Sequence, residues 1–244
     1  MPQLSKKMIH KLEISVVVPA YNEEKYIADC LQSLENQTFP KNSYEVIVVD
    51  NNSTDKTRKI AEEFGARVVG CQVQGVAAAR AVGSEAAYGE IIAGTDADTQ
   101  VPPAWLTKIA THFQEDSNLV GLTGPTYLND TNRLFSKFSF LSFDIFQRFN
   151  FLAGKPTFSG FNYAVRKDAY EEIGGFNTNL ESAEDIDLSF RLAKIGSVKY
   201  CSDVVVYTSA RRIKRTPFEF FRHNMKNYYL MLRKKEPEPF EPIR

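Results

Sequence analysis

The sequence has few cysteines and no net charge, and both absences exclude classes of protein. Cys30, Cys71 and Cys201 lie far apart and form no Cys-x-x-Cys or Cys/His pattern. This spacing argues against a disulfide framework or a zinc site and fits a reducing compartment. The 30 Lys and Arg residues are balanced by 30 Asp and Glu residues, so no overall basic charge favours a nucleic acid as partner.

Long hydrophobic runs are also missing. No stretch reaches the ~18 apolar residues that a membrane span needs, and residues 1–13 lack the apolar core of a signal peptide. We therefore expect a chain that does not itself cross a bilayer, although it is compatible with being the soluble part of a longer protein. With 43% hydrophobic residues, 25% charged residues and a length of 244, one large α/β domain is the favoured organisation.

The first half of the sequence alternates short apolar runs with helical patterns. Continuous apolar runs are typical of strands that are buried on both faces. Asn22 is the expected N-cap of the first helix, and Gly65 is expected to end the second. The β-α-β-α order predicts a parallel sheet with right-handed crossovers. Strands are predicted over residues 14–18, 44–49, 66–71 and 90–93, and helices over residues 24–37, 53–64 and 76–88.

The second half is less regular. Residues 134–152 are rich in Phe, and residues 211–235 carry nine Lys or Arg against one acidic residue. Such a basic cluster can meet phosphates or an anionic membrane surface. Strands are predicted over residues 119–128, 158–166 and 198–209, a helix over residues 184–194, and an extended tail around Pro237, Pro239 and Pro242.

Three polar clusters follow strands of the predicted parallel sheet. They are Tyr21-Asn22-Glu23, Asp50-Asn51-Asn52 and Asp96-Ala97-Asp98. Ligands of such sheets bind beyond the carboxyl ends of the strands. We therefore expect the three clusters to converge on one crevice, although they are far apart along the chain.

Asp96 and Asp98 are candidate metal ligands. Two carboxylates one residue apart on a turn can approach a divalent cation together, and their hard oxygen atoms suit Mg²⁺ or Mn²⁺. Such a metal would neutralise a diphosphate and assist its departure. Most Asp-x-Asp sequences are merely solvated turns, so the prediction depends on the buried strand before this pair and on the other two clusters.

Other charged residues have two interpretations each. Glu184 and Asp185 open a predicted helix, where acids favour the helix dipole, but one of them can also deprotonate an acceptor hydroxyl. Arg211 and Arg212 can bind phosphate oxygens or form a solvated pair. Arg80 can reach the same phosphates or brace the sheet.

These motifs together resemble family 2 glycosyltransferases with the GT-A fold. The donor-binding half of that family is similar to residues 16–24, 48–55 and 95–98, and the acceptor half to residues 159–162, 173–176, 184–185 and 191–192. The resemblance covers about residues 13–212. It implies a Rossmann-like, mostly parallel central sheet flanked by helices, with a donor half over about 13–100, an acceptor half over about 101–212, and a basic aromatic helix and tail over 213–244.

The resemblance also implies roles for individual residues. Asp185 is the expected inverting base, with Glu184 beside it, and Gly160 and Asn162 are expected on the acceptor side. Asp96 and Asp98 are expected to hold the diphosphate metal, Asp98 most directly. The nucleotide-sugar is expected to contact Pro19, Ala20 and Tyr21 in the base pocket, Glu23 at the ribose, Asp50 at the base, and Arg80, Asp96, Arg211 and Arg212.

The sequence departs from the family pattern in two places. The Gln-x-x-Arg-Trp motif of processive synthases is absent, which favours transfer of a single sugar. Many relatives have a His metal ligand after the last strand, whereas this chain has Tyr207-Thr-Ser-Ala-Arg-Arg212. The third metal ligand therefore stays open, and Arg211 and Arg212 become candidates for the diphosphate.

Two other classes of function compete with this interpretation. A nucleotidyltransferase would also use an α/β sheet with a carboxylate-bound metal, but a Gly-rich loop with a Lys is missing after the first strand. A non-catalytic sugar-nucleotide or membrane-binding module is the other alternative. The donor is expected to be a UDP-sugar or a GDP-sugar, and the acceptor is left open.

The C-terminal segment predicts a location for the chain. Residues 216–235 interleave aromatic and apolar side chains with Arg and Lys, a composition suited to a lipid headgroup boundary. We expect peripheral membrane contact there, a lipid-linked acceptor and a position at the cytoplasmic face of a membrane, with residues 134–152 as a second contact. The alternative is that both aromatic stretches pack in the core.

Overall fold

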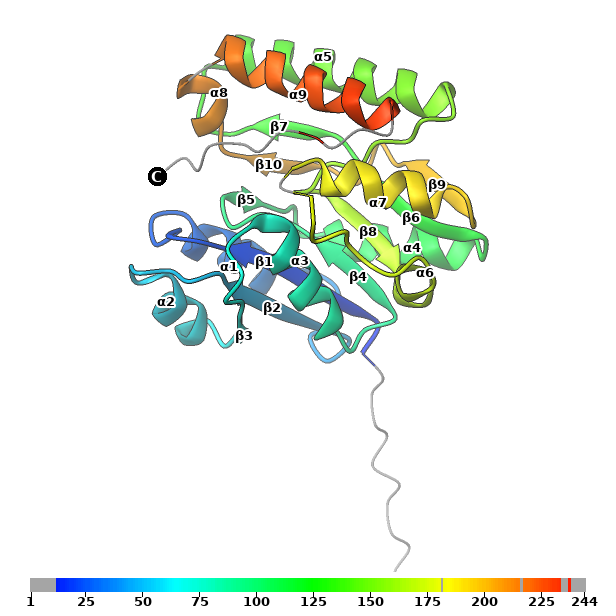
Figure 1. Cartoon of the computed structure of the whole chain (residues 1–244). Helices are drawn as coiled ribbons and strands as arrows, with labels where there is room; N and C mark the ends of the chain where they lie inside the picture. The colour runs from blue at the N-terminus through cyan, green and yellow to red at the C-terminus, as the bar shows by residue number, and fades with distance from the viewer. Residues whose placement is uncertain (1–11, 181, 216, 234–236, 238–244) are drawn as a thin grey trace, which may run out of the picture.

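The computed structural model describes residues 12–180, 182–215, 217–233 and 237, and Figure 1 shows a central sheet with helices on both faces. Seven strands of the described residues form that sheet, in the order β3-β2-β1-β4-β8-β6-β9. β1 pairs in parallel with β2 and β4, whereas β8 runs antiparallel to its neighbours β4 and β6. The strands are β1 (Ile14–Ala20), β2 (Tyr44–Asp50), β3 (Arg67–Gly70), β4 (Ile91–Gly94), β6 (Leu119–Thr123), β8 (Tyr163–Arg166) and β9 (Ser197–Tyr200).

Helices cover the two faces of this sheet because each buries one apolar side. One face packs on Trp105 and on residues of the first, second and fourth helices. The other face packs on Tyr163 and on residues of the third, sixth and seventh helices. The helices are α1 (Ile27–Glu35), α2 (Thr57–Glu63), α3 (Val76–Glu85), α4 (Trp105–Glu115), α5 (Arg133–Leu152), α6 (Lys167–Glu172), α7 (Glu184–Leu192), α8 (Arg211–Arg215) and α9 (Pro217–Leu232).

A second, smaller sheet corrects two predicted strands. The predicted strand over 119–128 is divided into β6 and β7 (Thr126–Leu128), and that over 198–209 into β9 and β10 (Val206–Thr208). β10 pairs with β7 and with β5 (Thr99–Gln100). The first break falls at Gly124 and Pro125, because Pro cannot donate to a strand ladder and a Cβ on Gly124 would lie 2.0 Å from the Val204 carbonyl oxygen.

The start of α1 was also predicted wrongly. Asn22 does not cap the helix, which begins at Ile27. Asn22 adopts a left-handed φ of 54°, and its Oδ1 accepts a hydrogen bond from the Thr54 amide at 2.8 Å. The residue therefore joins the loops after β1 and β2 instead of starting a helix. Gly65, with a φ of +72°, does end α2 as predicted.

A third layer lies over the small sheet. Figure 1 shows α5 and α9 next to each other at the top of the molecule, above β7 and β10. The two helices are in contact, because Phe146 and Tyr228 stack edge to face with ring centroids 5.3 Å apart. None of the described helices combines the length and apolarity required to span a bilayer. Pro239 and Pro242 of the predicted tail lie outside the described residues.

Candidate active site

The predicted strand-end clusters meet at one edge of the sheet. The loops after β1 and β2 are joined at Asn22, and the Glu23 amide donates to Thr57 Oγ1 at 2.7 Å. Asp50 is 9% exposed and accepts from the Ser53 amide at 3.1 Å. Pro19, Ala20 and Tyr21 end the neighbouring strand β1 and lead into the same edge.

The Asp96-Ala97-Asp98 segment forms the turn between β4 and β5. The Thr99 amide donates to the Asp96 carbonyl at 3.0 Å. The small sheet holds the other side of the turn, because the Ser209 amide donates to the Asp98 carbonyl at 3.2 Å and Thr99 Oγ1 lies 2.8 Å from Thr208 Oγ1. Asp98 is thereby placed between the two sheets.

Arg80 joins the two halves of the molecule through a buried cluster of charges. The residue is 4% exposed. Its Nη2 lies 2.7 Å from Asp96 Oδ1, and its Nη1 forms an ion pair with Glu184 on α7, which is 3% exposed. We name Arg80, Asp96 and Glu184 the buried cluster. Buried charges require such pairing, because an unpaired charge would lose its hydration without compensation.

The buried cluster bears on two predicted residues. Arg80 braces two carboxylates, which is one of the two roles expected for it. Gly160 serves that arrangement, since a Cβ there would lie 2.5 Å from both terminal nitrogens of Arg80. Gly160 therefore makes room for the guanidinium, and its predicted acceptor contact stays a prediction.

Asp185 lies beside the buried cluster, next to Glu184 on α7, and within the described part of the chain it forms no ion pair. Burial and, to a smaller extent, the charge of Glu184 raise the pKa of Asp185 to about 7, against the lowering effect of Arg80 and of the amides of Ile186 and Gly160. Its Oδ1 accepts from the Ile186 amide at 2.9 Å. A carboxylate with a pKa near neutrality is suited to accept a proton in a reaction.

A second charged cluster lies at the edge of the site. Arg211 donates to both oxygens of Glu23, at 2.8 and 2.5 Å, and its Nε lies 2.8 Å from Asp98 Oδ2. The guanidinium also lies over the ring of Tyr26, 4.8 Å from its centroid. We name Glu23, Asp98 and Arg211 the edge cluster. The side chain of Arg212 lies outside the described part of the structure.

A cavity of about 370 Å³ adjoins the edge cluster. Tyr26, Asp98 and Ser209 are among the residues that line it. Cys30 also lines it, and burial raises the pKa of this thiol well above its usual range, so the thiol is not a nucleophile there. Tyr26 was missed in the sequence, although its position three residues after Glu23 places it at the same end of the sheet.

Asp96 and Asp98 fit a metal that arrives with its substrate. The described residues contain no group of three His, Cys, Asp or Glu side chains placed to hold a metal alone. Mg²⁺ is commonly bound by one or two carboxylates together with substrate phosphates and water. Asp96 and Asp98 offer two such carboxylates and would be the protein ligands of that metal, with no His in the β10 segment to complete the set.

Asn162, predicted on the acceptor side, has a side chain that binds other groups of the protein. It is fully buried. Its Oδ1 accepts from Trp105 Nε1 at 3.1 Å, and its Nδ2 donates to the Val204 carbonyl at 2.8 Å. Asn162 therefore satisfies backbone and side-chain groups where the two sheets separate, and it presents no polar atom to a ligand.

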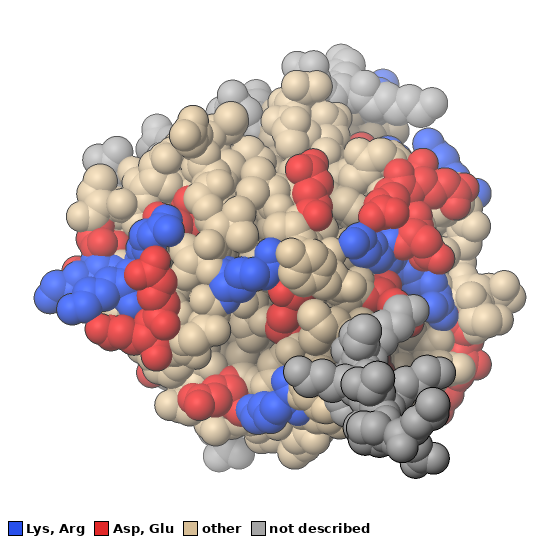
Figure 2. All heavy atoms as spheres, turned by 90° about the horizontal axis from the view of Figure 1, so that it is seen from below, with Lys and Arg blue, Asp and Glu red and all other residues tan. Residues whose placement is uncertain are grey.

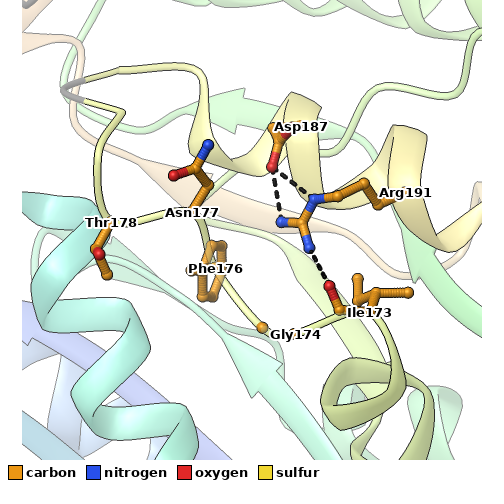
Figure 3. A pocket seen from close by; sticks show the side chains of 8 residues that line it. Ile173, Gly174, Phe176, Asn177, Thr178, Asp187 and Arg191 are labelled. Atoms are coloured by element: carbon orange, nitrogen blue, oxygen red, sulfur yellow. Dashed lines mark hydrogen bonds and ion pairs between the residues drawn. The ribbon is translucent and has the colours of Figure 1, made fainter.

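A second cavity, of about 350 Å³, lies beside α7 and contains the predicted 173–176 motif. Figure 3 shows Arg191 between Asp187 and the Ile173 carbonyl. Arg191 Nε donates to Asp187 at 2.8 Å and its Nη1 donates to the Ile173 carbonyl at 2.9 Å. These charges are committed to each other, so they fix the loop onto α7 rather than prepare a site.

Comparison with known proteins assigns the family. Residues 15–174 match the profile of glycosyl transferase family 2. Glycosyltransferase AglE of Haloferax volcanii is 32% identical over 206 residues, which is 81% of this chain and 67% of that protein. A β-monoglucosyldiacylglycerol synthase of Nostoc is 32% identical over 73% of this chain and 41% of its own length. The chain thus spans well under two thirds of the second relative.

Solved structures agree with this assignment. Staphylococcus aureus TarS, crystallised in complex with UDP-GlcNAc, is 25% identical with a TM-score of 0.66, covering 81% of this chain and 58% of that chain. The mannosyltransferase PcManGT of Pyrobaculum calidifontis, in complex with GDP-Man and Mn²⁺, shares the fold with a TM-score of 0.70 and 23% identity over 89% of this chain and 62% of its own.

The fold and the site thus define a GT-A glycosyltransferase. The chain belongs to glycosyl transferase family 2.

Proposed function

We propose that this chain transfers a single sugar from a UDP- or GDP-sugar onto an acceptor hydroxyl or lipid phosphate, with inversion and with Mg²⁺ or Mn²⁺. The observation that carries the proposal is the position of Asp185. This carboxylate, with its pKa raised to about 7, lies next to the residue that Arg80 ties to Asp96. The proposed base and the proposed metal ligands are therefore fixed relative to each other.

The donor would lie along the carboxyl edge of the sheet. Pro19, Ala20 and Tyr21 are proposed to line the base pocket, with Asp50 at the base and Glu23 at the ribose. Asp96 and Asp98 would hold the metal, whose chemistry is to neutralise the leaving diphosphate. Arg211 and Arg212 are proposed to bind diphosphate oxygens, for which Arg211 would exchange its present carboxylate partners.

Asp185 would supply the other half of the reaction. Its carboxylate takes the proton of the acceptor hydroxyl while that oxygen forms a bond to the anomeric carbon. The bond from that carbon to the diphosphate breaks on the opposite side, so the nucleoside diphosphate leaves and the configuration inverts. A phosphate acceptor is already ionised and would not need this base, so the raised pKa of Asp185 favours a hydroxyl.

The acceptor class has support from one relative. The Nostoc protein is named a β-monoglucosyldiacylglycerol synthase, which is a glycolipid product. We propose a lipid-linked acceptor for this chain on that ground and on the basic composition of its C-terminal segment.

A donor panel tests the proposal. Thermal-shift measurements with Mn²⁺ should show stabilisation by one class of nucleotide-sugar, because a ligand of the folded state raises the melting temperature. Turnover should release the nucleoside diphosphate, and NMR of the product should show the inverted anomeric configuration. Release of pyrophosphate would favour a nucleotidyltransferase, and donor binding without any turnover would favour a binding module.

A further inference from the structure

Helix α5 exposes several large apolar side chains to water and buries two polar ones. Gln147 and Asn150 are 1% and 2% exposed, whereas Phe149 and Leu152 are 68% and 88% exposed. A water-facing helix normally shows the opposite arrangement, with apolar residues inside and polar residues outside. The outer face of α5 therefore has the character of a surface that meets an apolar medium.

Five apolar residues of α5, each more than half exposed, form one continuous stripe. They recur at intervals of seven, four, four and three positions, which keeps them on the same side of a helix. We name them the α5 stripe. It consists of Leu134, Leu141, Ile145, Phe149 and Leu152, with exposed fractions of 80%, 54%, 57%, 68% and 88%.

Helix α9 adds a parallel set. Met225, Tyr229 and Leu232 are 39%, 53% and 42% exposed, and their spacing of four and three positions also places them on one helix face. Since α5 and α9 touch through Phe146 and Tyr228, the two helices make one surface. Figure 1 shows this layer at the outer limit of the molecule.

Basic residues flank the apolar surface. Among the described side chains of residues 133–155 and 222–233, Asp144 is the single acid, and it is engaged by Arg148 and Tyr200. Figure 2 shows a different distribution on the face seen from below, where acidic and basic residues are interspersed. The exposed basic residues of the α5–α9 layer are Lys137, Arg148, Lys155, Arg222, Lys226 and Arg233.

We propose that the α5–α9 layer docks onto a bilayer that contains anionic lipid, with the α5 stripe entering the headgroup boundary. Apolar side chains on one helix face together with flanking Lys and Arg are the combination that binds such an interface. A second copy of this chain is disfavoured as occupant, because it would bring the same basic residues against each other.

The inner side of this layer contacts the acceptor half of the chain. Asn227 on α9 is 3% exposed and donates to Ser182 Oγ at 2.8 Å, two residues before Glu184. Gln147 on α5 donates to Ser159 Oγ at 3.0 Å, next to Gly160. A docked layer would thus hold the proposed base close to the membrane surface. The role of this surface in the reaction rests on the proposed transferase function, whereas the binding of lipid by the surface does not.

Co-sedimentation of the full chain with vesicles tests the inference. We expect binding to vesicles of equal parts phosphatidylcholine and phosphatidylglycerol at low salt, and weaker binding to pure phosphatidylcholine or at high salt. The variant Leu141→Gln/Ile145→Gln/Phe149→Gln should reduce the partition coefficient at least about tenfold. Lys137→Gln/Lys155→Gln/Arg222→Gln should reduce it on the order of 100-fold at low salt. Tyr88→Gln, at an exposed aromatic residue outside this layer (69% exposed), should bind like the unaltered chain.

Three outcomes would overturn the inference. The first is that the unaltered chain does not bind anionic vesicles. The second is that the α5 stripe variant sediments with vesicles as well as the unaltered chain does. The third is a concentration-dependent dimer that forms without lipid and that the α5 stripe variant abolishes, which would assign the surface to a second copy. The thermal shift by nucleotide-sugar and Mn²⁺ should persist in every variant. If vesicle binding fails while that shift persists, the docking surface is wrong and the proposed function stands.

Discussion

The buried cluster and the edge cluster have the same chemistry, an arginine between two carboxylates, but their arginines differ in exposure to water. In the buried cluster, the side chains of Arg80 and Glu184 are each 5% exposed, and that of Asp96 is 31% exposed. In the edge cluster, the Arg211 side chain is 20% exposed and its partner Asp98 lines a cavity. Loss of the carboxylate partner of a buried arginine is strongly destabilising, because water cannot replace that partner. An arginine beside a cavity can exchange a carboxylate partner for an anionic ligand.

From this difference we expect Arg80 to position other residues and Arg211 to bind ligand. Arg80 connects the donor half to α7, so it fixes where Asp185 stands relative to the proposed metal ligand Asp96. Arg211 begins the short helix α8 that leads to α9, and its carboxylate partners are the residues proposed to meet ribose and metal. The following predictions test that separation, from the largest expected effect to the smallest.

Asp98→Ala should abolish transfer, because the leaving diphosphate would lose its charge compensation. Asp98→Asn should also be severely impaired while it remains folded, since the amide keeps the shape of the side chain. Sugar-transfer assays with added Mn²⁺ or Mg²⁺ measure both variants. EDTA should stop the unaltered chain, and full activity in EDTA would contradict the metal-dependent site.

Arg80→Ala should lower the free energy of unfolding by about 3–5 kcal/mol, because it leaves two carboxylates without their buried partner. Denaturant unfolding measures this change. The matched control is Lys59→Ala, whose exposed ion pair with Glu63 lies on α2 and should contribute less than about 1 kcal/mol. Equal effects of the two substitutions would mean that the ion pairs of the buried cluster contribute no more to the free energy of unfolding than a surface ion pair does.

Asp185→Asn should fold and bind donor with metal but transfer sugar to a hydroxyl at least ~10²-fold more slowly, as expected on loss of a general base. Single-turnover assays separate this effect from donor binding. If Glu184→Gln proves inactive and Asp185→Asn does not, the roles of these two neighbours are exchanged.

The pH dependence of kcat/KM should depend on both Asp185 and Glu184. A base works in its deprotonated form, so kcat/KM should rise with pH through a limb near pH 7, the value to which the Asp185 pKa is raised. Glu184→Gln removes a negative neighbour that raises this pKa, so the limb should move to lower pH. An unchanged limb in that variant would show that another group titrates in the reaction.

Local patterns were sufficient for the donor half. The apolar runs of β1, β2 and β4 predicted strands because a strand buried on both faces has no polar alternation. The polar residues after them had to meet at one edge, since parallel strands end on the same side. The ends of α1 were less predictable, because Asn22 hydrogen-bonds across to the next loop, and such a partner has no local signal.

Local patterns failed where two sheets share one stretch of chain. Residues 119–128 were predicted as one strand because apolar and β-branched residues lie on both sides of Gly124 and Pro125, although these two residues are themselves disfavoured in strands. The close approach of Gly124 to Val204 adds a tertiary contact that no local pattern shows. The motif that contains Asn162 was a sound indication of the family but gave no indication of the hydrogen-bond partners of this residue. Its side chain is used by groups that are distant in sequence.

The sequence by itself determined the class of fold, the family, the acidic residues of the site and the aromatic, basic character of the C-terminal segment. These features depend on residues that are close together in the sequence and on strand or helix periodicity. Only the tertiary structure decided that Arg80 pairs with Glu184, 104 positions away, and that α5 turns its apolar stripe outward. Both depend on which surfaces meet when the chain folds, and an amphipathic pattern alone does not say which side will face the protein.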